Sequence, residues 1–108
     1  RTVRKAEECF AAAQAGPVSL ADLCVAAGVS QVTLYHAFMV MCGSSPMAYF
    51  KKRRLTDARQ ALLRSGPEIG LVKRAALGAG LTHLGRFSEE YLQLFGELPT
   101  TTLNLRSR

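Results

Sequence analysis

The sequence predicts an all-α fold of about seven helices, in which one small helical unit occurs twice. No stretch of the 108 residues shows the strict apolar and polar alternation that marks a half-buried strand. Apolar residues recur instead at helical spacing between Gly and Pro residues. Two stretches then share one spacing, fifty-three positions apart and without a gap: Ser30, Leu34, Phe38, Gly43 and Pro46, matched by His83, Phe87, Tyr91, Gly96 and Pro99.

The first copy lies in an expected first lobe, residues 1–45. A helix over about Thr2–Ala15 stops at a Gly-Pro pair. Ser19 caps a short second helix, and Asp22 completes a capping box with it. A glycine-bearing turn leads into a third helix, which Ser30 caps and Gly43 ends. A short helix, a turn and an amphipathic helix form a helix-turn-helix, the unit that places a helix in a DNA groove.

A long connecting helix is expected over residues 46–65. Ser45 and Pro46 open it with a cap residue and a proline at the first helical position. Nineteen residues, 46–64, span roughly 28 Å, which approaches the rise of about 34 Å per DNA turn. One alternative is that both lobes pack into a single seven-helix bundle. The absence of a helix breaker in this stretch favours a rigid rod that holds two reading heads.

The second copy lies in an expected second lobe, residues 66–108. Helices are predicted over about Glu68–Gly78 and His83–Phe95, with a short final helix after Pro99. One helix-turn-helix pattern is weak evidence because two packed helices with a glycine turn are common. The duplication makes two helix-turn-helix lobes joined by a long central helix the favoured fold.

The net charge of +6 is concentrated in the middle of the chain. Residues 1–36 carry three basic and three acidic side chains, residues 37–66 carry six and one, and residues 67–108 carry five and four. The connecting helix is therefore a candidate electrostatic footprint for a polyanion. The alternative is a solvated helix face. Its basic residues are Lys51, Lys52, Arg53, Arg54, Arg59 and Arg64.

Composition argues against several other classes of protein. No apolar run approaches 18 residues and no segment resembles a signal peptide, so a soluble cytoplasmic chain without membrane contact is expected. Cys9, Cys24 and Cys42 fit no metal-ligand spacing and are interpreted as structural, and neither a metal nor another cofactor is expected. No nucleophile motif or phosphate loop is present, which argues against an enzyme.

Some twenty positions between about Ser19 and Thr102 match one family at its spacing. The run includes Leu34-x3-Phe38-x4-Gly43-x-Ser-Pro46, Arg54-Leu55-x2-Ala58-Arg59 and Phe87-Ser-x2-Tyr91-x3-Phe95-Gly96-x2-Pro99. This pattern resembles the DNA-binding domain of AraC/XylS-type bacterial transcription regulators. The resemblance implies sequence-specific binding to double-stranded DNA, RNA polymerase as a partner, activation as the usual outcome, and an N-terminal effector or dimerisation domain. Because the chain begins at Arg1, a fragment of a longer protein is expected.

The resemblance also implies which positions meet DNA. Base contacts are carried over to the outward positions of the two recognition helices: Val32, Tyr35, His36, Leu84, Gly85, Arg86, Ser88 and Glu89. Phosphate contacts are expected near helix N-termini and on the connecting helix: Ser19, Ser30, Gln31, Lys51, Lys52, Arg53, Thr82 and His83. His83 is expected to serve as a phosphate neighbour or a cap.

The chemistry of these side chains suggests individual roles. His36 can donate or accept at a purine edge, Tyr35 can use its hydroxyl, and Val32 can pack on a thymine methyl. Arg86 suits a bidentate guanine contact or a phosphate, whereas Glu89 can accept from cytosine although phosphates repel it.

Helical phase predicts which side chains face each core. Leu34, Ala37, Phe38 and Met41 are expected inside the first lobe, and Phe87, Tyr91, Leu94 and Phe95 inside the second. Met39 and Val40 fall outward, which indicates either a different helical phase with core packing, the favoured interpretation, or a protein partner. Arg54 and Arg59 are expected to tie the lobes together, for example through Asp57 or Glu68.

Two hypotheses compete with DNA binding. A helical adaptor that binds a protein without nucleic acid is favoured by the weakly charged recognition helices. An RNA binder ranks lower, because Tyr35 alone makes no stacking platform. The recognition helix of the second lobe has a net charge of about −1, so the first lobe and the connecting helix are expected to supply most of the DNA affinity.

Overall fold

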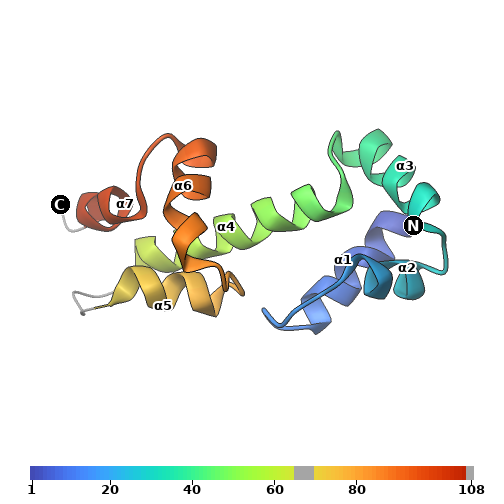
Figure 1. The fold of residues 1–108 in the computed structure, drawn as a ribbon, viewed down its shortest axis with the longest axis horizontal. Coiled ribbons are helices and arrows are strands. Elements are labelled where there is room, and N and C mark those ends of the chain that lie inside the picture. The colour runs from blue at the N-terminus through green and yellow to red at the C-terminus, as the bar shows by residue number, and fades with distance from the viewer. Residues whose placement is uncertain (65–69, 107–108) are drawn as a thin grey trace. The chain divides into compact units, whose positions relative to one another are not determined.

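The computed structural model describes residues 1–64 and 70–106, and within these it contains helices and no strand (Figure 1). The all-α prediction is confirmed. The described residues form seven helices: α1 (Thr2–Ala12), α2 (Leu20–Ala27), α3 (Gln31–Cys42), α4 (Pro46–Arg64), α5 (Leu71–Gly78), α6 (Leu84–Phe95) and α7 (Pro99–Arg106).

The chain forms two compact units, which consist of Arg1–Lys51 and Lys52–Arg108. The boundary lies inside α4, a helix that runs without interruption for 19 residues. Its first turns therefore belong to unit 1 and its later turns to unit 2, so that a single helix serves both cores.

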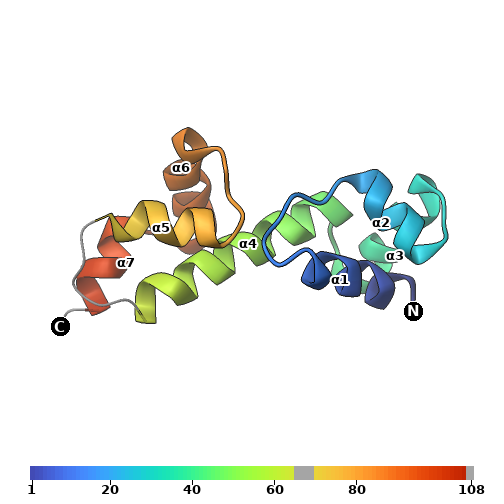
Figure 2. The same cartoon turned by 90° about the horizontal axis from the view of Figure 1, so that it is seen from below.

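Unit 1 packs α1, α2 and α3 together (Figure 2). The side chains between these helices form an apolar core, to which Phe50 of α4 also belongs. Leu23, Leu34 and Phe38 are completely buried, and Phe10 stacks on Phe50 with ring centroids 4.5 Å apart. Aromatic pairs of this kind contribute about 0.5–1.5 kcal/mol beyond the area they bury. The three cysteines also pack against this cluster, as partly buried small side chains, and no disulfide joins them.

Unit 2 packs the later turns of α4 against α5, α6 and α7. Ala58 and Leu62 of α4 meet Ala76 of α5 and Tyr91 of α6, and all four side chains are completely buried. Thr102 of α7 is also buried, with 1% of its surface exposed. The interior of unit 2 therefore contains polar groups, which must find hydrogen-bond partners within the unit.

The first helix ends earlier than the sequence predicts. It stops at Ala12 rather than Ala15, and Gln14 and Ala15 adopt left-handed backbone angles with φ of 49° and 70°. The Gly16 N–H donates to the Ala13 carbonyl at 2.8 Å and closes a turn there. Pro17 disfavours a helical conformation at the residue before it, so the chain leaves the helix ahead of the Gly-Pro pair.

Burial in the last turns of α3 and α6 also differs from the prediction. Met41 and Leu94 were expected in the cores, yet 72% and 36% of their surfaces are exposed. Cys42 packs against the first core instead, whereas Phe95, which was also predicted inside, packs against the second. The buried stripe therefore continues four residues beyond Phe38 and Tyr91, and the residue three beyond each is exposed.

The other predicted boundaries lie close to the observed ones. Gly43 and Gly96, at equivalent positions of the repeat, end α3 and α6 with φ of 72° and 76°. Only glycine adopts this left-handed conformation without a steric cost, which explains why both recognition helices end there. Gly70 precedes α5 rather than lying within it, and the predicted start near Glu68 lies outside the described residues.

No single helix in residues 1–64 and 70–106 has the length and apolar character to cross a membrane; α2 and α3 meet that test only as a pair bent by 86°.

Candidate nucleic-acid interface

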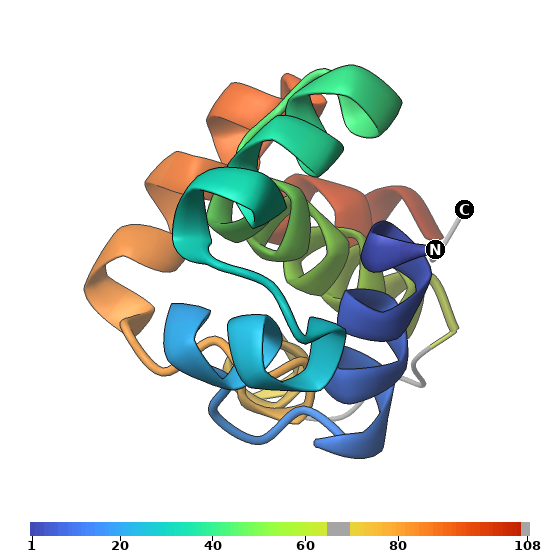
Figure 3. The ribbon, with the colours of Figure 1, turned by 90° about the vertical axis from the view of Figure 1, so that its right-hand side faces the viewer.

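The α2–turn–α3 segment of unit 1 has helix-turn-helix geometry (Figure 3). The two helices are bent by 86° at a short turn, close to the 90–120° typical of the motif. Gly28 ends α2 in the left-handed region, with φ of 67°. The second helix of such a pair is the recognition helix, so the exposed side of α3 is the candidate reading surface.

The predicted base-contact residues of α3 are all exposed. Val32 exposes 68% of its surface and Tyr35 49%, and His36 is exposed as well. They lie opposite Leu34 and Phe38, whose side chains are fully buried. Unit 1 therefore presents these three side chains to solvent from one rigid helix.

The N-terminus of α3 is tightly capped. Ser30 adopts an extended conformation, and its Oγ accepts a hydrogen bond from the Thr33 N–H at 3.2 Å. The Ser30 hydroxyl also donates to Thr33 Oγ1 at 3.1 Å. Thr33 is exposed beside Val32, and it was not among the predicted contact residues. The helical spacing that places Val32 outward also places Thr33 on the exposed side of α3.

The exposed side of α3, which is the candidate reading surface, carries no formal charge. Its residues that follow His36 are apolar. Met39 and Val40 expose 39% and 81% of their surfaces. The interpretation that a different helical phase packs them in the core is therefore wrong. The outward positions that helical phase predicted for Met39 and Val40 are confirmed.

The exposed face of α6 differs from that of α3. Gly85, Arg86, Ser88 and Glu89 are exposed, and Leu84 exposes 36% of its surface. His83 occupies the N-cap position, but its side chain makes no capping hydrogen bond and its ψ is 74°. The expected capping role of His83 is therefore absent, and the first N–H groups of α6 lack the side-chain acceptor that Ser30 supplies to α3.

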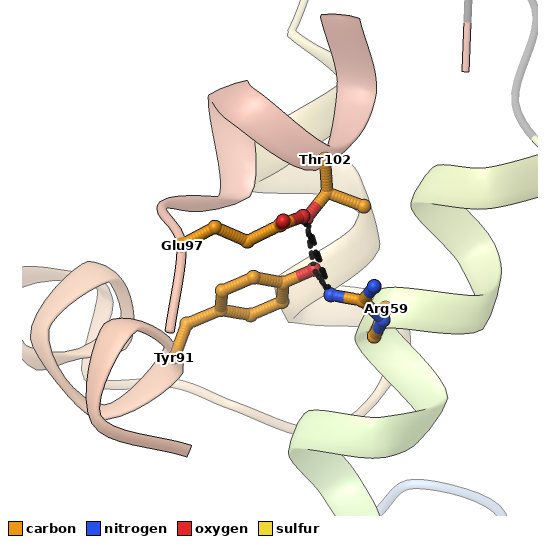
Figure 4. Close-up of polar contacts among 4 residues, drawn as sticks. All are labelled: Arg59, Tyr91, Glu97 and Thr102. Atoms are coloured by element: carbon orange, nitrogen blue, oxygen red, sulfur yellow. Dashed lines mark hydrogen bonds and ion pairs between the residues drawn. The ribbon is translucent and has the colours of Figure 1, made fainter. Parts of the chain in front are cut away.

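A partly buried polar network joins α6 to α4 and α7 (Figure 4). Arg59 Nη1 lies 3.3 Å from Glu97 Oε2 and 3.5 Å from Tyr91 Oη. The Tyr91 hydroxyl donates to Thr102 Oγ1 at 2.7 Å, and the Thr102 hydroxyl donates to Glu97. The Arg59 guanidinium also lies 4.9 Å from the centre of the Phe95 ring.

This network corrects the predicted partners of Arg59. The ion pair is with Glu97 rather than Asp57, and it lies within unit 2. Glu68, the other partner suggested from the sequence, lies outside the described residues. Glu97 was missed because 38 residues separate it from Arg59, so no local pattern connects them.

The basic residues of α4 divide between solvent and core. Lys52 and Arg53 are exposed and Lys51 is half-buried. Arg54 Nη1 donates to the Ala79 carbonyl at 3.2 Å. Burial lowers the pKa of the Arg54 guanidinium, and Asp57 partly opposes this shift. Arg54 therefore stabilises unit 2 through the Ala79 carbonyl, whereas the Lys52 and Arg53 side chains are exposed.

At the N-terminus of α2, Ser19 and Asp22 are joined by reciprocal hydrogen bonds. The Ser19 N–H donates to Asp22 Oδ2 at 2.9 Å, and the Asp22 N–H donates to Ser19 Oγ at 3.0 Å. The predicted capping box is confirmed. The Ser19 backbone N–H, and after it the Ser19 side chain, stabilise the ionised carboxylate of Asp22 and hold its pKa below the usual value. A phosphate bound near Ser19 would be repelled by this carboxylate.

The remaining predicted phosphate contacts, Gln31 and Thr82, are exposed beside the first turns of α3 and α6. Among the described residues, no three His, Cys, Asp or Glu side chains are grouped in a way that could hold a metal ion.

The sequence and fold match a known family. A family model described as a helix-turn-helix domain matches residues 23–104, which include α2 from Leu23 onward, α3, and both helices of α5–turn–α6. The chain belongs to the AraC/XylS family. It is an AraC-type helix-turn-helix DNA-binding domain, as the resemblance implied, and its family consists of transcription regulators rather than enzymes.

Several relatives and solved structures of the AraC/XylS family are similar to this domain. XylDLEGF operon transcriptional activator 2 of Pseudomonas putida is 40% identical over 88 residues, which cover 82% of this chain and 56% of the relative. The probable thc operon regulatory protein of Rhodococcus erythropolis is 36% identical over 101 residues, which cover 94% and 30%. The chain thus spans 56% or less of these curated relatives.

Two crystal structures share the fold of the domain. A probable AraC family transcriptional regulator from Rhodopseudomonas palustris has a TM-score of 0.81 and 36% identity, and the match covers 97% of this chain and 96% of that one. A transcriptional regulator of the AraC DNA-binding type from Chromobacterium violaceum has a TM-score of 0.84 and 26% identity, over 99% and 93%.

Proposed function

We propose that the domain reads double-stranded DNA by inserting α3 and α6 into successive segments of the major groove. The observation that carries this proposal is the repeat itself, because each copy supplies a recognition helix with an exposed face that follows a glycine-bearing turn. The lobes of residues 1–45 and 66–108 are the reading heads in this proposal, and residues 46–65 connect them.

We assign base contacts to the exposed side chains of the two recognition helices. In α3 these are Val32, Tyr35 and His36. In α6, Leu84, Gly85, Arg86, Ser88 and Glu89 face solvent. Arg86 is the one cation among them, and a bidentate pair with guanine would discriminate by about 1–3 kcal/mol.

Phosphate contacts are assigned to helix N-termini and to α4. Lys52 and Arg53 are exposed, and Lys51 contributes a half-buried charge beside them. The other candidates flank helix starts, namely Ser19, Ser30, Gln31, Thr82 and His83. Ser19 is the weakest of these, since its N–H and hydroxyl already bond Asp22 and the carboxylate repels an anion.

Unit 1 and α4 are proposed to supply most of the DNA affinity. Arg86 on α6 is outweighed by Glu89 and Glu90, which neighbouring phosphates repel. The complete protein is proposed to be a cytoplasmic activator that contacts RNA polymerase and carries an N-terminal effector or dimerisation domain. The curated relatives, which extend well beyond the matched region, support this view.

Selection of bound sequences from a random duplex pool tests the mode of reading. Two short half-motifs about one DNA turn apart are expected. A single half-motif would refute reading by both helices. Absence of duplex binding at any salt concentration would refute the proposed function and leave the adaptor hypothesis.

Titrations of variants test the ranking of the two helices. The paired change Tyr35→Ala and His36→Ala is expected to weaken binding more than Arg86→Ala. Lys73→Ala serves as the control for Arg86→Ala, because it removes one exposed charge from α5 rather than from α6. A larger loss from Arg86→Ala than from the α3 pair would reverse the ranking.

A further inference from the structure

A polar contact joins α1 to the start of α4 within unit 1. The Tyr49 hydroxyl donates to Glu7 Oε2 at 2.6 Å, across 42 positions of the sequence. Both side chains are half-buried. A hydrogen bond to an ionised carboxylate is about twice as strong as one between neutral groups. The bond therefore holds the first residues of α4 in a defined position against α1.

The ring of Tyr49 also contacts the recognition helix α3. It lies edge-on to Phe38, with ring centroids 5.4 Å apart. Phe38 is completely buried, whereas Tyr35 and His36 are exposed on the opposite side of α3. Apolar burial is non-directional, but a hydrogen bond constrains both a distance and an angle. Glu7 thus fixes the ring against which the inner side of α3 packs.

The joint between α3 and α4 consists of residues 43–45. A joint of this kind does not by itself fix the angle between two helices, so side-chain contacts must hold it. Tyr49 supplies such contacts to both α3 and α1. Lys51, an assigned phosphate contact, follows Tyr49 by two residues on α4. Base and phosphate contacts require side chains placed to within about 0.5 Å, so the position of Tyr49 bears on both.

We propose that Glu7 is a positioning residue for DNA binding, which acts through Tyr49 to set the angle between α3 and the start of α4. This inference rests on the proposed insertion of α3 into the major groove. Glu7 also carries a negative charge, which DNA phosphates repel. Electrostatics alone therefore predicts that removing Glu7 strengthens DNA binding, whereas the positioning role predicts that binding weakens.

Glu8 provides a matched control on the same helix. It is the next residue of α1, it has the same side chain, and it is exposed. Glu7→Ala and Glu8→Ala remove the same charge from neighbouring positions, but the first also removes the acceptor of the Tyr49 hydroxyl. Tyr49→Phe removes the donor and keeps the ring that packs against Phe38.

The test titrates each variant with the duplex found by sequence selection, at a temperature where circular dichroism shows that the variant is fully folded. Glu7→Ala and Tyr49→Phe are each expected to weaken binding about five-fold, the net effect of one hydrogen bond. The double variant is expected to lose no more than either single variant, because both break the same contact. Glu8→Ala is expected to bind at least as tightly as the unmodified domain. Glu7→Gln keeps an acceptor oxygen and is expected to recover part of the loss.

Discrimination between base sequences separates positioning from a loss of stability. A base-pair substitution in the half-site read by α3 weakens binding of the unmodified domain, and the same substitution is expected to matter less for Glu7→Ala. Substitutions in the half-site read by α6 are expected to keep their full effect. A contact that only stabilises the fold would change neither result, because the measurements use fully folded protein.

Other outcomes overturn the inference. If Glu7→Ala binds as tightly as Glu8→Ala, or if its loss adds to that of Tyr49→Phe, the contact does not position α3, although the proposed function stands. Unchanged discrimination in the half-site read by α3, or an equal loss in both half-sites, overturns it as well. If the unmodified domain binds no duplex, the proposed function fails and this inference fails with it.

Discussion

Units 1 and 2 share one sequence spacing but differ at the centre of their cores. Phe38 and Tyr91 occupy equivalent positions of the repeat, and both are completely buried. Phe38 lies among aromatic rings, with Phe50 at 5.6 Å between ring centroids. Tyr91 also packs against aromatic rings, those of Phe87 and Phe95, but its hydroxyl enters a network with Thr102 and Arg59. The repeat thus specifies where a large aromatic side chain is buried, and the residues around that side chain decide whether it also forms hydrogen bonds.

The reading surfaces of the units differ as much as their cores. Helix α3 is uncharged and has a serine cap, whereas α6 carries three charged side chains, Arg86, Glu89 and Glu90, and has no side-chain cap. Residues 1–51 contain four basic and three acidic side chains, and residues 52–108 contain ten and five. The uncharged helix α3 therefore lies in a nearly neutral unit, whereas the charged helix α6 lies in a basic unit.

Exchanging the equivalent aromatic residues should have the largest effect, and it should be asymmetric. Phe38→Tyr buries a hydroxyl among apolar side chains and is expected to lower the free energy of unfolding by about 3 kcal/mol. Tyr91→Phe removes one hydrogen bond and is expected to cost about 1 kcal/mol. Urea unfolding measures both changes. Equal costs would show that the two cores are chemically interchangeable.

Removal of the Arg59 side chain should affect unit 2 alone. Arg59→Ala breaks the ion pair with Glu97 and the bonds to Tyr91 and Thr102, and is expected to cost about 2 kcal/mol. Hydrogen exchange should then accelerate in α6 and α7 but not in α1 to α3. Arg59→Lys, which keeps the charge, should recover part of the loss. Equal acceleration in both units would contradict a network confined to unit 2.

The caps of the two recognition helices offer a smaller contrast. Ser30→Ala removes an acceptor for the Thr33 N–H and is expected to cost about 1 kcal/mol. His83→Ala should change stability little, since the His83 side chain makes no capping bond. Thermal unfolding of the two variants measures the difference. A similar loss from both would indicate a cap at α6 that its backbone geometry does not provide.

The smallest expected effect is a local response of α2 to acid. The pKa of Asp22 is lower in the folded chain than its ordinary value of about 3.9. The capping box is therefore stabilising above that ordinary pKa, and the contribution is lost as the pH falls through the lower folded pKa. Protection of the α2 amides from exchange, measured relative to the intrinsic rate at each pH, should fall in this range, whereas α5, which follows Gly70 without a side-chain cap, should lack this response.

An Asp22→Asn variant is the control for the acid response. It keeps a side-chain oxygen near the Ser19 N–H but cannot titrate. Its α2 exchange should vary with pH in the same way as that of α5. A persistent acid response in this variant would place the titrating group elsewhere.

The helices, the repeat and the serine and glycine caps were predictable from the sequence, because these features depend on neighbouring residues, whereas the cap expected at His83 is absent. A serine before a helix and a glycine after it act through hydrogen bonds and backbone angles within a few positions. The capping box at Ser19 and the end of α3 at Gly43 were therefore predicted correctly. The exposed positions Val32, Tyr35 and His36 also followed from helical phase.

The tertiary structure alone decided which end residues are buried and which charges pair. Helical phase places Met41 and Cys42 on similar sides of α3, and only the arrangement of the neighbouring core selects Cys42. Arg59 likewise had several carboxylates within reach along the chain, yet packing of α4 against α6 and α7 brings Glu97 to it. Burial and ion pairing depend on contacts between distant segments, which no local spacing specifies.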